Sequence, residues 1–391
     1  MERRPGVPRL LREINDRAAL ELLLAEGPMT RGQIGDQTGL SKVTASQTLA
    51  RLEERGLVEV VGVQAGGRGP NAALYSVVSN SAYVAGLQIG PETVSTAIAD
   101  IHGRTLAEVT VTPDAGDPVS VVHSAVVKAC RTARVSLAKL RGVVIGTPGV
   151  VDPRSGDVHF SFDLPAWHEG IQQALARDLK RDVTIENDVN LAAVAERADG
   201  AARGLDDFVL LWADRGIGLA IVLDGKLHRG RTGSAGEIGY LPVPGVPLPE
   251  DVRDEPGRLP SLAGGLQSLV SAEAVAGVAK GYGFADSEPD EYVGAALAAG
   301  ELGEPFLDEI ARRLALGVAA VCVVLDPGRV VLAGEVCKAG GSALTERVEE
   351  AVARICPIRP EVVTTTVEGN PVLRGAVLAA LDQAREELFV S

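Results

Sequence analysis

The chain has 391 residues, more than one ordinary core accommodates, so we expect at least two domains. Hydrophobic residues make up 46% and aromatic residues 3%, which is typical of a folded protein and excludes an intrinsically disordered chain. The formal charge is −14 and is uneven: residues 1–75 contain ten Lys or Arg and nine Asp or Glu, which leaves −15 on residues 76–391. The body should therefore repel nucleic acid, and any DNA contact is expected from the first 75 residues.

The sequence shows no sign of export or membrane insertion. Its first residues lack the apolar core of a signal peptide, and no apolar run approaches the roughly 18 residues of a membrane span. The four Cys residues are widely spaced, and no pair has the spacing of metal ligands. We expect a cytoplasmic protein with buried, reduced cysteines.

The first 75 residues have the pattern of a winged helix-turn-helix. Apolar residues recur at helical spacing from Leu10 to Leu23 and predict a first helix, which a Gly-Pro pair ends. Thr30 and Gln33 have the spacing of a capping box for a second helix, and Ser41 can cap a third. Strands are predicted over residues 57–63 and 73–77, and they form the hairpin known as the wing.

The third helix is predicted to read DNA. Val43, Leu49 and Leu52 are expected to face inward, which leaves a polar face without acidic residues for base edges and phosphates in the major groove. A solvated polar stripe is the alternative interpretation of this face, and an incidental Arg in a flexible loop is the alternative for the wing. The predicted DNA contacts are Arg31, Ser41, Lys42, Thr44, Gln47, Thr48, Arg51 and Arg68.

From Tyr83 onward, short apolar strands alternate with helices, as in an α/β fold. Strands over residues 83–89, 94–101 and 105–111 predict a β-meander, and a helix is predicted near residues 119–135. Two further strands end in Gly146-Thr147-Pro148-Gly149 and in Glu186-Asn187-Asp188. Polar groups at strand ends commonly line the binding crevice of an open α/β sheet.

The ordered motifs of this region resemble those of the ROK family of repressors and sugar kinases. Each motif is weak alone, but all occur in the order of the family, and the winged helix matches its repressor branch. The motifs are Gly146-Thr147-Pro148-Gly149-Val150-Val151-Asp152, Asp163-Leu164-Pro165-Ala166-Trp167, Glu186-Asn187-Asp188-Val189-Asn190, Gly216-Ile217-Gly218, Gly236-Glu237-Ile238-Gly239-Tyr240, and Asp326-Pro327 before Gly334.

The resemblance implies a fold and a division into domains. After a winged helix-turn-helix at residues 1–78, it implies a two-lobed, actin-like ATPase fold of the sugar kinase and ribonuclease H-like type. Residues 82–187 would form the smaller lobe, completed by a C-terminal helix over residues 371–388, and residues 188–370 would form the larger lobe. A sugar would bind in the cleft between the lobes.

The resemblance also implies roles for residues of the cleft. In the kinases of the family, the residue that matches Asp188 is the general base, and those that match Asn187 and Glu237 hydrogen-bond sugar hydroxyls. The predicted ligand-binding residues are Gly149, Asp163, Asn187, Asp188, Glu237, Tyr240 and Gln267.

Departures from the family pattern argue against catalysis. The kinases open with an Asp-x-Gly-Gly-Thr phosphate loop, where this chain has Gln88 in place of the Asp and Glu92 beside the phosphate positions. Asp214 adds an acid to the nucleotide-side turn. The family's structural zinc is also not expected, because Tyr240 replaces its histidine and no Cys or His lies between Tyr240 and Ser271. We therefore expect neither ATP nor zinc, and a vestigial role for Asp188.

These expectations favour a homodimeric or tetrameric transcription repressor of sugar uptake or catabolism genes, with DNA and a sugar or sugar derivative as partners. Substitutions at Asp163, Tyr240, Gln267 and Gln88 indicate either a pocket adapted to another sugar or a relic cleft with control by a partner protein. An active sugar kinase with an added DNA-binding domain, and an interaction module without specific DNA binding, are the remaining alternatives.

Overall fold

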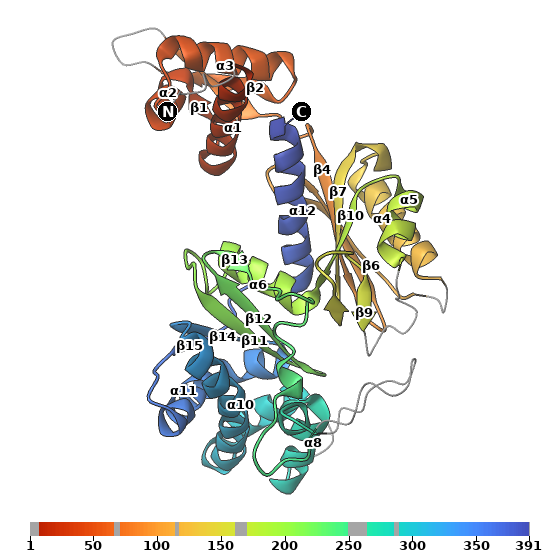
Figure 1. The fold of residues 1–391 in the computed structure, drawn as a ribbon, viewed down its shortest axis with the longest axis vertical. Coiled ribbons are helices and arrows are strands. Elements are labelled where there is room, and N and C mark those ends of the chain that lie inside the picture. Colours follow the sequence, from red (N-terminus) through yellow and green to blue (C-terminus); the bar gives the residue numbers. More distant parts are fainter. Residues whose placement is uncertain are drawn as a thin grey trace, which may run out of the picture.

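The computed structural model describes residues 8–65, 71–113, 117–160, 170–248, 264–284 and 289–390. Three bodies follow one another along its long axis (Figure 1): an N-terminal helical domain with a small sheet, a smaller lobe and a larger lobe. One long C-terminal helix, α12 (Pro371–Val390), runs from the larger lobe along the smaller lobe to the N-terminal domain.

The N-terminal domain is a winged helix-turn-helix, as predicted. Its elements are α1 (Pro8–Glu26), β1 (Met29–Thr30), α2 (Arg31–Thr38), α3 (Lys42–Glu54), β2 (Val58–Gln64) and β3 (Ala72–Val77). The three strands form a sheet in the order β1-β3-β2, with antiparallel pairs. The predicted capping box is present, because the side chain of Thr30 accepts from the backbone N–H of Gln33 and that of Gln33 accepts from Thr30. Gly39 ends α2 in the left-handed conformation that the tight corner requires (φ 72°).

The helices lie where the apolar periodicity predicts them, but their buried faces are shifted. In α1, Leu10, Leu11 and Ile14 are all more than half exposed, and the core contacts come from Ala19, Leu20 and Leu23. These three side chains share a core with Leu388 and Phe389 from the end of α12. The C-terminus of the chain therefore helps to build the N-terminal domain.

The smaller lobe contains a five-stranded sheet in the order β10-β7-β4-β5-β6. Strands β4, β5 and β6 form the predicted antiparallel meander, whereas β7 and β10 run parallel to β4. The strands are β4 (Tyr83–Ile89), β5 (Val94–Asp100), β6 (Thr105–Val111), β7 (Leu140–Thr147) and β10 (Val183–Asn187), with helices α4 (Pro118–Ala133) and α5 (Ile171–Leu179), the 3-10 turn Leu137–Lys139 and a small hairpin, β8 (Val150–Val151) and β9 (Val158–Phe160).

The larger lobe repeats this design with a second five-stranded sheet in the order β13-β12-β11-β14-β15. Its strands are β11 (Phe208–Ala213), β12 (Ile217–Leu223), β13 (Lys226–Leu227), β14 (Arg329–Ala333) and β15 (Glu361–Thr364). Its helical elements are α7 (Gln267–Val270), α8 (Ala272–Gly281), α9 (Pro289–Ala298), α10 (Glu304–Leu325), α11 (Glu335–Ile355) and the 3-10 turns Ile238–Tyr240 and Gly300–Leu302. Helix α6 (Asp188–Asp199) follows β10 directly and lies between the lobes.

Helix α12 returns from the larger lobe and packs against β4, β7 and α6. The approach is close: a Cβ at Gly86 would lie 2.6 Å from the backbone nitrogen of Val377, and a side chain at Gly375 would collide with the carbonyl of Leu191. Small residues on both sides therefore let the helix lie flat on the sheet. The same helix then continues to the winged helix-turn-helix.

Three of the four cysteines are buried, as expected, while Cys356 is half-buried. Burial raises the pKa of Cys130 to about 11 and that of Cys337 to about 12, so these thiols remain protonated and behave as small apolar groups. Within the described ranges, no helix is both long and apolar enough to span a membrane.

Candidate functional site

The exposed face of α3 differs from the predicted one. Ser41 caps the helix by accepting from the N–H of Thr44 (3.1 Å), and its hydroxyl lies 2.8 Å from that of Thr44. Lys42 and Gln47 are exposed, and the guanidinium of Arg31 reaches the hydroxyl of Ser46 across the helix pair (3.4 Å). The surface available for base contacts is therefore centred on the first two turns of α3.

One predicted DNA contact and one predicted core residue are wrong, and a second predicted contact, Arg51, is engaged within the domain. Thr48 has an exposed fraction of 0%, and Arg51 turns toward α1, where it forms an ion pair with the buried carboxylate of Asp16 (2.5 Å). Val43, predicted to face inward, is 67% exposed. The helix packs on Ala45, Thr48, Leu49 and Leu52, a face rotated relative to the predicted one. Arg68 lies outside the described residues.

A second candidate site lies at the junction of β10 and α6, where the two lobes meet. Asn187 caps α6 by accepting from the N–H of Asn190 (3.1 Å), and its amide nitrogen donates to the carbonyl of Gly149 (3.1 Å). The hydrogen bond joins the loops that follow the neighbouring parallel strands β7 and β10. An Asn side chain has two donors and two acceptor positions, so one of each remains for a ligand.

Asp188, Glu237 and Tyr240 gather beside this junction. Burial, and then the charge of Asp188, raise the pKa of Glu237 above its ordinary value. Burial and Glu237 together raise the pKa of Tyr240 to about 12. Carboxylate oxygens at these two positions can accept hydrogen bonds from the hydroxyl groups of a polyol.

Gln267 is held by the larger lobe and lies next to the Tyr240 turn. Its side-chain oxygen accepts from the backbone N–H of Ile217 in β12 (3.3 Å), and the same side chain lies against Gly239, next to Tyr240. The structure thus links Gly149, Asn187, Asp188, Glu237, Tyr240 and Gln267 into one neighbourhood, whereas Asp163 lies outside the described residues.

One half-buried ion pair in this neighbourhood was missed from the sequence. Glu186 accepts from Arg229 (2.6 Å), from the amide of Asn190 (2.9 Å) and from the backbone N–H of Asn187 (3.0 Å). It therefore fixes the turn that presents Asn187 and Asp188. The motif containing Glu186 marked one half of the pair, but no sequence signal pointed to Arg229, 43 residues further along the chain.

A second group of polar contacts lies where β4 meets the start of α12. Asn370, directly before α12, donates to the side-chain oxygen of Gln88 at the end of β4. The oxygen of Asn370 accepts from the N–H of Leu373 (3.0 Å) and so caps α12. Glu92 is exposed, and Asp214 accepts from the N–H of Arg215 (2.9 Å). Across the part of the chain that the structure describes, no three His, Cys, Asp or Glu side chains are placed to hold a metal ion.

The model of the ROK family matches residues 84–383, well over half of the chain. The chain belongs to the ROK family. A MarR family model matches residues 14–69, so this ROK protein carries a MarR-like helix-turn-helix before its actin-like sugar kinase fold.

Named relatives and solved structures share this arrangement. The DNA-binding transcriptional dual regulator NagC of Escherichia coli strain K12 is 26% identical, over 84% of this ROK chain and 82% of that protein. The xylose repressor of Caldicellulosiruptor bescii is 24% identical, over 88% of both chains. The fold resembles the crystal structure of a ROK family transcriptional regulator described as a homologue of the E. coli MLC protein, with a TM-score of 0.74, 20% identity, and 97% and 98% of the two chains covered.

Proposed function

We propose that this protein is a transcription repressor of genes for sugar uptake or catabolism, controlled by a sugar or sugar derivative in the cleft. The observation that carries the proposal is the polar neighbourhood of Asn187, Asp188 and Glu237, which lies in the same chain as a helix-turn-helix with an exposed first half of α3. The relatives named as N-acetylglucosamine and xylose repressors support both halves of the proposal.

The DNA contacts come from the start of α3. Lys42 and Gln47 can reach base edges in the major groove. Near the N-terminal end of α3, the DNA backbone would be contacted by Arg31, Ser41 and Thr44. Arg68 in the wing completes this proposed set. Thr48 and Arg51 instead hold α3 against α1.

The cleft binds a sugar but does not transfer a phosphoryl group. Phosphoryl transfer requires positive charge around the phosphates, whereas Glu92 and Asp214 bring negative charge, and Gln88 cannot hold a metal ion as an aspartate would. The amide of Gln88 is instead engaged with Asn370. Neither ATP nor zinc is part of the proposed function, and Asp188 serves as a hydrogen-bond acceptor for a sugar hydroxyl.

Helix α12 is the proposed connection between the sugar and the DNA. Its first turn is tied to Gln88 through Asn370, and its last turn contributes Leu388 and Phe389 to the core of the N-terminal domain. Arg17 of α1 pairs with Glu386 and lies over the ring of Phe389, 5.0 Å from its centroid. A change in the angle between the lobes would therefore move the helix-turn-helix with α12.

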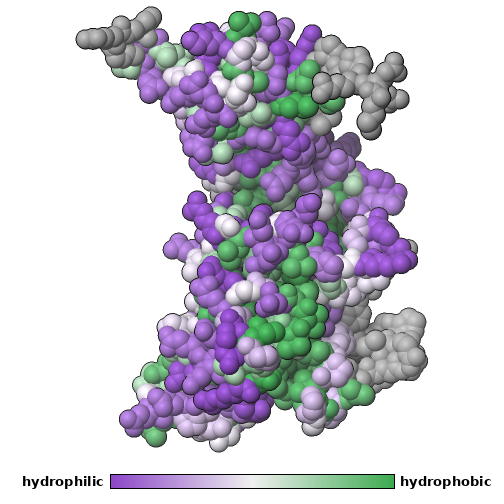
Figure 2. Space-filling model, turned by 60° about the vertical axis from the view of Figure 1, so that its left-hand side comes forward, coloured by the Kyte–Doolittle hydropathy of each residue, from purple (hydrophilic) through white to green (hydrophobic). Residues whose placement is uncertain are grey.

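A homodimer would place two recognition helices on a pseudo-palindromic operator. Exposed hydrophobic side chains on the larger lobe, among them Leu302, Val323 and Val324, support association through that lobe. Figure 2 shows apolar surface gathered over this lower part of the molecule.

The test is a thermal-shift panel of sugars and sugar phosphates, combined with selection of genomic fragments by the purified protein. We expect one sugar class to raise the Tm, as linkage requires of a ligand that binds the folded state. A panel without any shift, from a protein that still retains DNA, would favour a relic cleft controlled by a partner protein. A protein that retains no fragment would instead be an interaction module.

A further inference from the structure

A groove of about 750 Å³ lies away from the cleft, at the end of the smaller lobe that borders the winged helix-turn-helix. One side of it is Asn80 and Ser81, in the connection from the N-terminal domain, and Glu387 of α12 also lines it. The rest comes from the start of β7 and the end of α5. Five of the lining residues are basic, and we call this surface the basic groove: Lys139, Arg141, Arg177, Lys180 and Arg181.

This concentration of positive charge is exceptional in an acidic body. Residues 128–141 contain five Lys or Arg and no Asp or Glu, although residues 76–391 together carry −15. Only two carboxylates, those of Asp182 and Glu387, line the groove against its five cations. Five cations and two carboxylates give the lining a formal charge of +3, opposite in sign to the net charge of residues 76–391.

The five cations also lack the carboxylate partners that arginines have elsewhere. In the described ranges, none of the five forms an ion pair. Arg181 donates only to the backbone carbonyls of Lys180 (2.8 Å) and Ala138 (2.5 Å), and its Nε is buried without a hydrogen-bond partner. By contrast, ion pairs are formed by Arg154, Arg197, Arg229, Arg312, Arg313, Arg329, Arg347, Arg354 and Arg374.

In the described part of the winged helix-turn-helix, three arginines are engaged within the protein. Arg17 is held by Glu21 and Glu386, Arg51 by Asp16, and Arg55 by Asp16 and the carbonyl of Leu388. Each phosphate contact in a protein–DNA complex needs a cation or donor, and affinity depends strongly on how many are made. These three arginines therefore pack the domain and are not available for phosphates.

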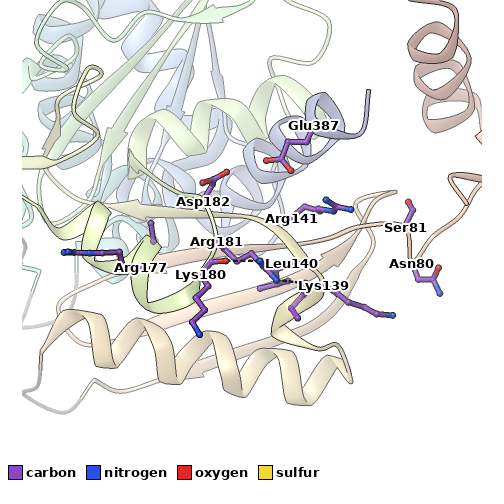
Figure 3. Close-up of a pocket in the computed structure, with 12 residues that line it drawn as sticks. Asn80, Ser81, Lys139, Leu140, Arg141, Arg177, Lys180, Arg181, Asp182 and Glu387 are labelled. Carbon is purple, nitrogen blue, oxygen red and sulfur yellow. Dashed lines mark hydrogen bonds between the residues drawn. The ribbon is translucent and has the colours of Figure 1, made fainter. Parts of the chain in front are cut away.

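We infer that the basic groove binds the phosphate backbone of DNA that flanks the site read by α3. The inference rests on the proposed DNA-binding function. Figure 3 shows the cations spread from Arg177 through Lys180 and Arg181 to Lys139 and Arg141, with Ser81 and Asn80 at the end nearest the N-terminal domain. Separate charges spread in this way suit the repeated phosphates of a duplex better than one compact anion.

The experiment compares two charge-matched variants of the full chain. The groove variant is Lys139→Gln, Arg141→Gln and Lys180→Gln. The control variant, Lys226→Gln, Lys338→Gln and Arg359→Gln, removes three exposed cations from the larger lobe. The probes are the sequence that the fragments enriched by the wild-type chain have in common, as a duplex trimmed to that sequence, and the same duplex extended by about one helical turn on each side. Circular dichroism melts establish that both variants are folded.

We expect the extended duplex to bind the wild type more tightly, and with a steeper dependence on salt, than the trimmed duplex. The slope of log K against log salt is negative. For the groove variant on the extended duplex it should become shallower by about 2 to 3, since each phosphate contact contributes about −0.9. Affinity for that duplex should fall at least roughly tenfold at about 0.1 M salt. Neither variant should change binding of the trimmed duplex.

Equal slopes for the groove and control variants on the extended duplex would overturn the inference while leaving the proposed function intact. Equal slopes together with stabilisation of the wild type alone by inorganic phosphate would overturn it in favour of a small-anion site. A wild-type chain that retains no DNA would remove the proposed function, and the inference with it.

Discussion

Two polar regions of the kinase-like body differ in what their side chains are engaged in. Where β10 meets α6, the carboxylate of Glu237 is buried near Asp188, and each side of the Asn187 amide makes one hydrogen bond within the protein. Where β4 meets α12, Asn370 donates to Gln88 and also caps α12. A cluster of buried acceptors is suited to binding a polar ligand, whereas a contact between two elements is suited to fixing their geometry. On the proposed function, the first region senses the sugar and the second passes the change to α12.

The largest effect is expected from Asp188→Asn. Loss of a charged hydrogen-bond acceptor costs about 1.5–3 kcal/mol, so sugar affinity should fall roughly 10- to 150-fold. The measurement is the thermal shift as a function of sugar concentration. Glu92→Gln, between β4 and β5, is the matched loss of one acidic charge and should leave the shift unchanged. An undiminished shift in Asp188→Asn would place the sugar elsewhere.

An intermediate effect is expected from Asn370, whose two contacts can be separated. Asn370→Ala removes the cap and the bond to Gln88, and should lower the free energy of unfolding by about 0.5–2 kcal/mol. Asn370→Ser keeps a capping oxygen but loses the donor to Gln88. It should retain most of the stability and the sugar affinity, and reduce the change in DNA affinity that the sugar causes. If that change is as large as in the wild type, α12 is not the connection.

A smaller effect, with a characteristic pH dependence, is expected from Glu237→Gln. Because the folded protein holds the pKa of Glu237 above its ordinary value of 4.5, ionisation of this group opposes folding. The stability contributed by the protonated form is fully present below a pH of about 4.5, the ordinary pKa, and is lost as the pH rises through the raised pKa of the folded protein. The Tm of the variant, measured without sugar, should therefore exceed that of the wild type by a margin that grows with pH, while its response to sugar weakens. Exposed Glu349→Gln is the control. A difference in Tm that does not depend on pH would show that folding does not raise the pKa of Glu237.

No effect is expected from ATP. Magnesium and ATP should produce neither a thermal shift nor sugar-dependent turnover in a coupled assay, since Glu92 and Asp214 oppose the phosphate charge. Gln88→Asp alone should not restore turnover, because both acids remain. Turnover in the wild type that Asp188→Asn abolishes would show instead that this protein is a sugar kinase.

Local signals predicted the elements well, and contacts between distant residues limited the rest. The capping box of Thr30 and Gln33 and the meander of β4 to β6 depend on neighbours in sequence or on alternation along a strand. The buried face of α3 depends on Asp16, 35 residues from Arg51, and that of α1 on the end of α12. Periodicity alone could not assign either face.

In the cleft, the family motifs brought together residues that the structure also places together. The motifs did not show that Asn187 is tied to Gly149 or that Glu186 is paired with Arg229, since these contacts cross between separate elements. The net charge of the body also failed to predict where positive charge gathers on its surface. The net −15 of the body conceals the basic groove, because opposite charges that cancel in a sum lie on different surfaces.

The most direct test of the account is the affinity of the protein for its selected genomic fragment, measured by fluorescence anisotropy with and without the sugar that raises its Tm. The sugar should change DNA affinity, and DNA should change sugar affinity by the same factor, because linkage is reciprocal. A sugar that stabilises the protein in the cleft, yet leaves DNA affinity the same, would contradict the proposed function.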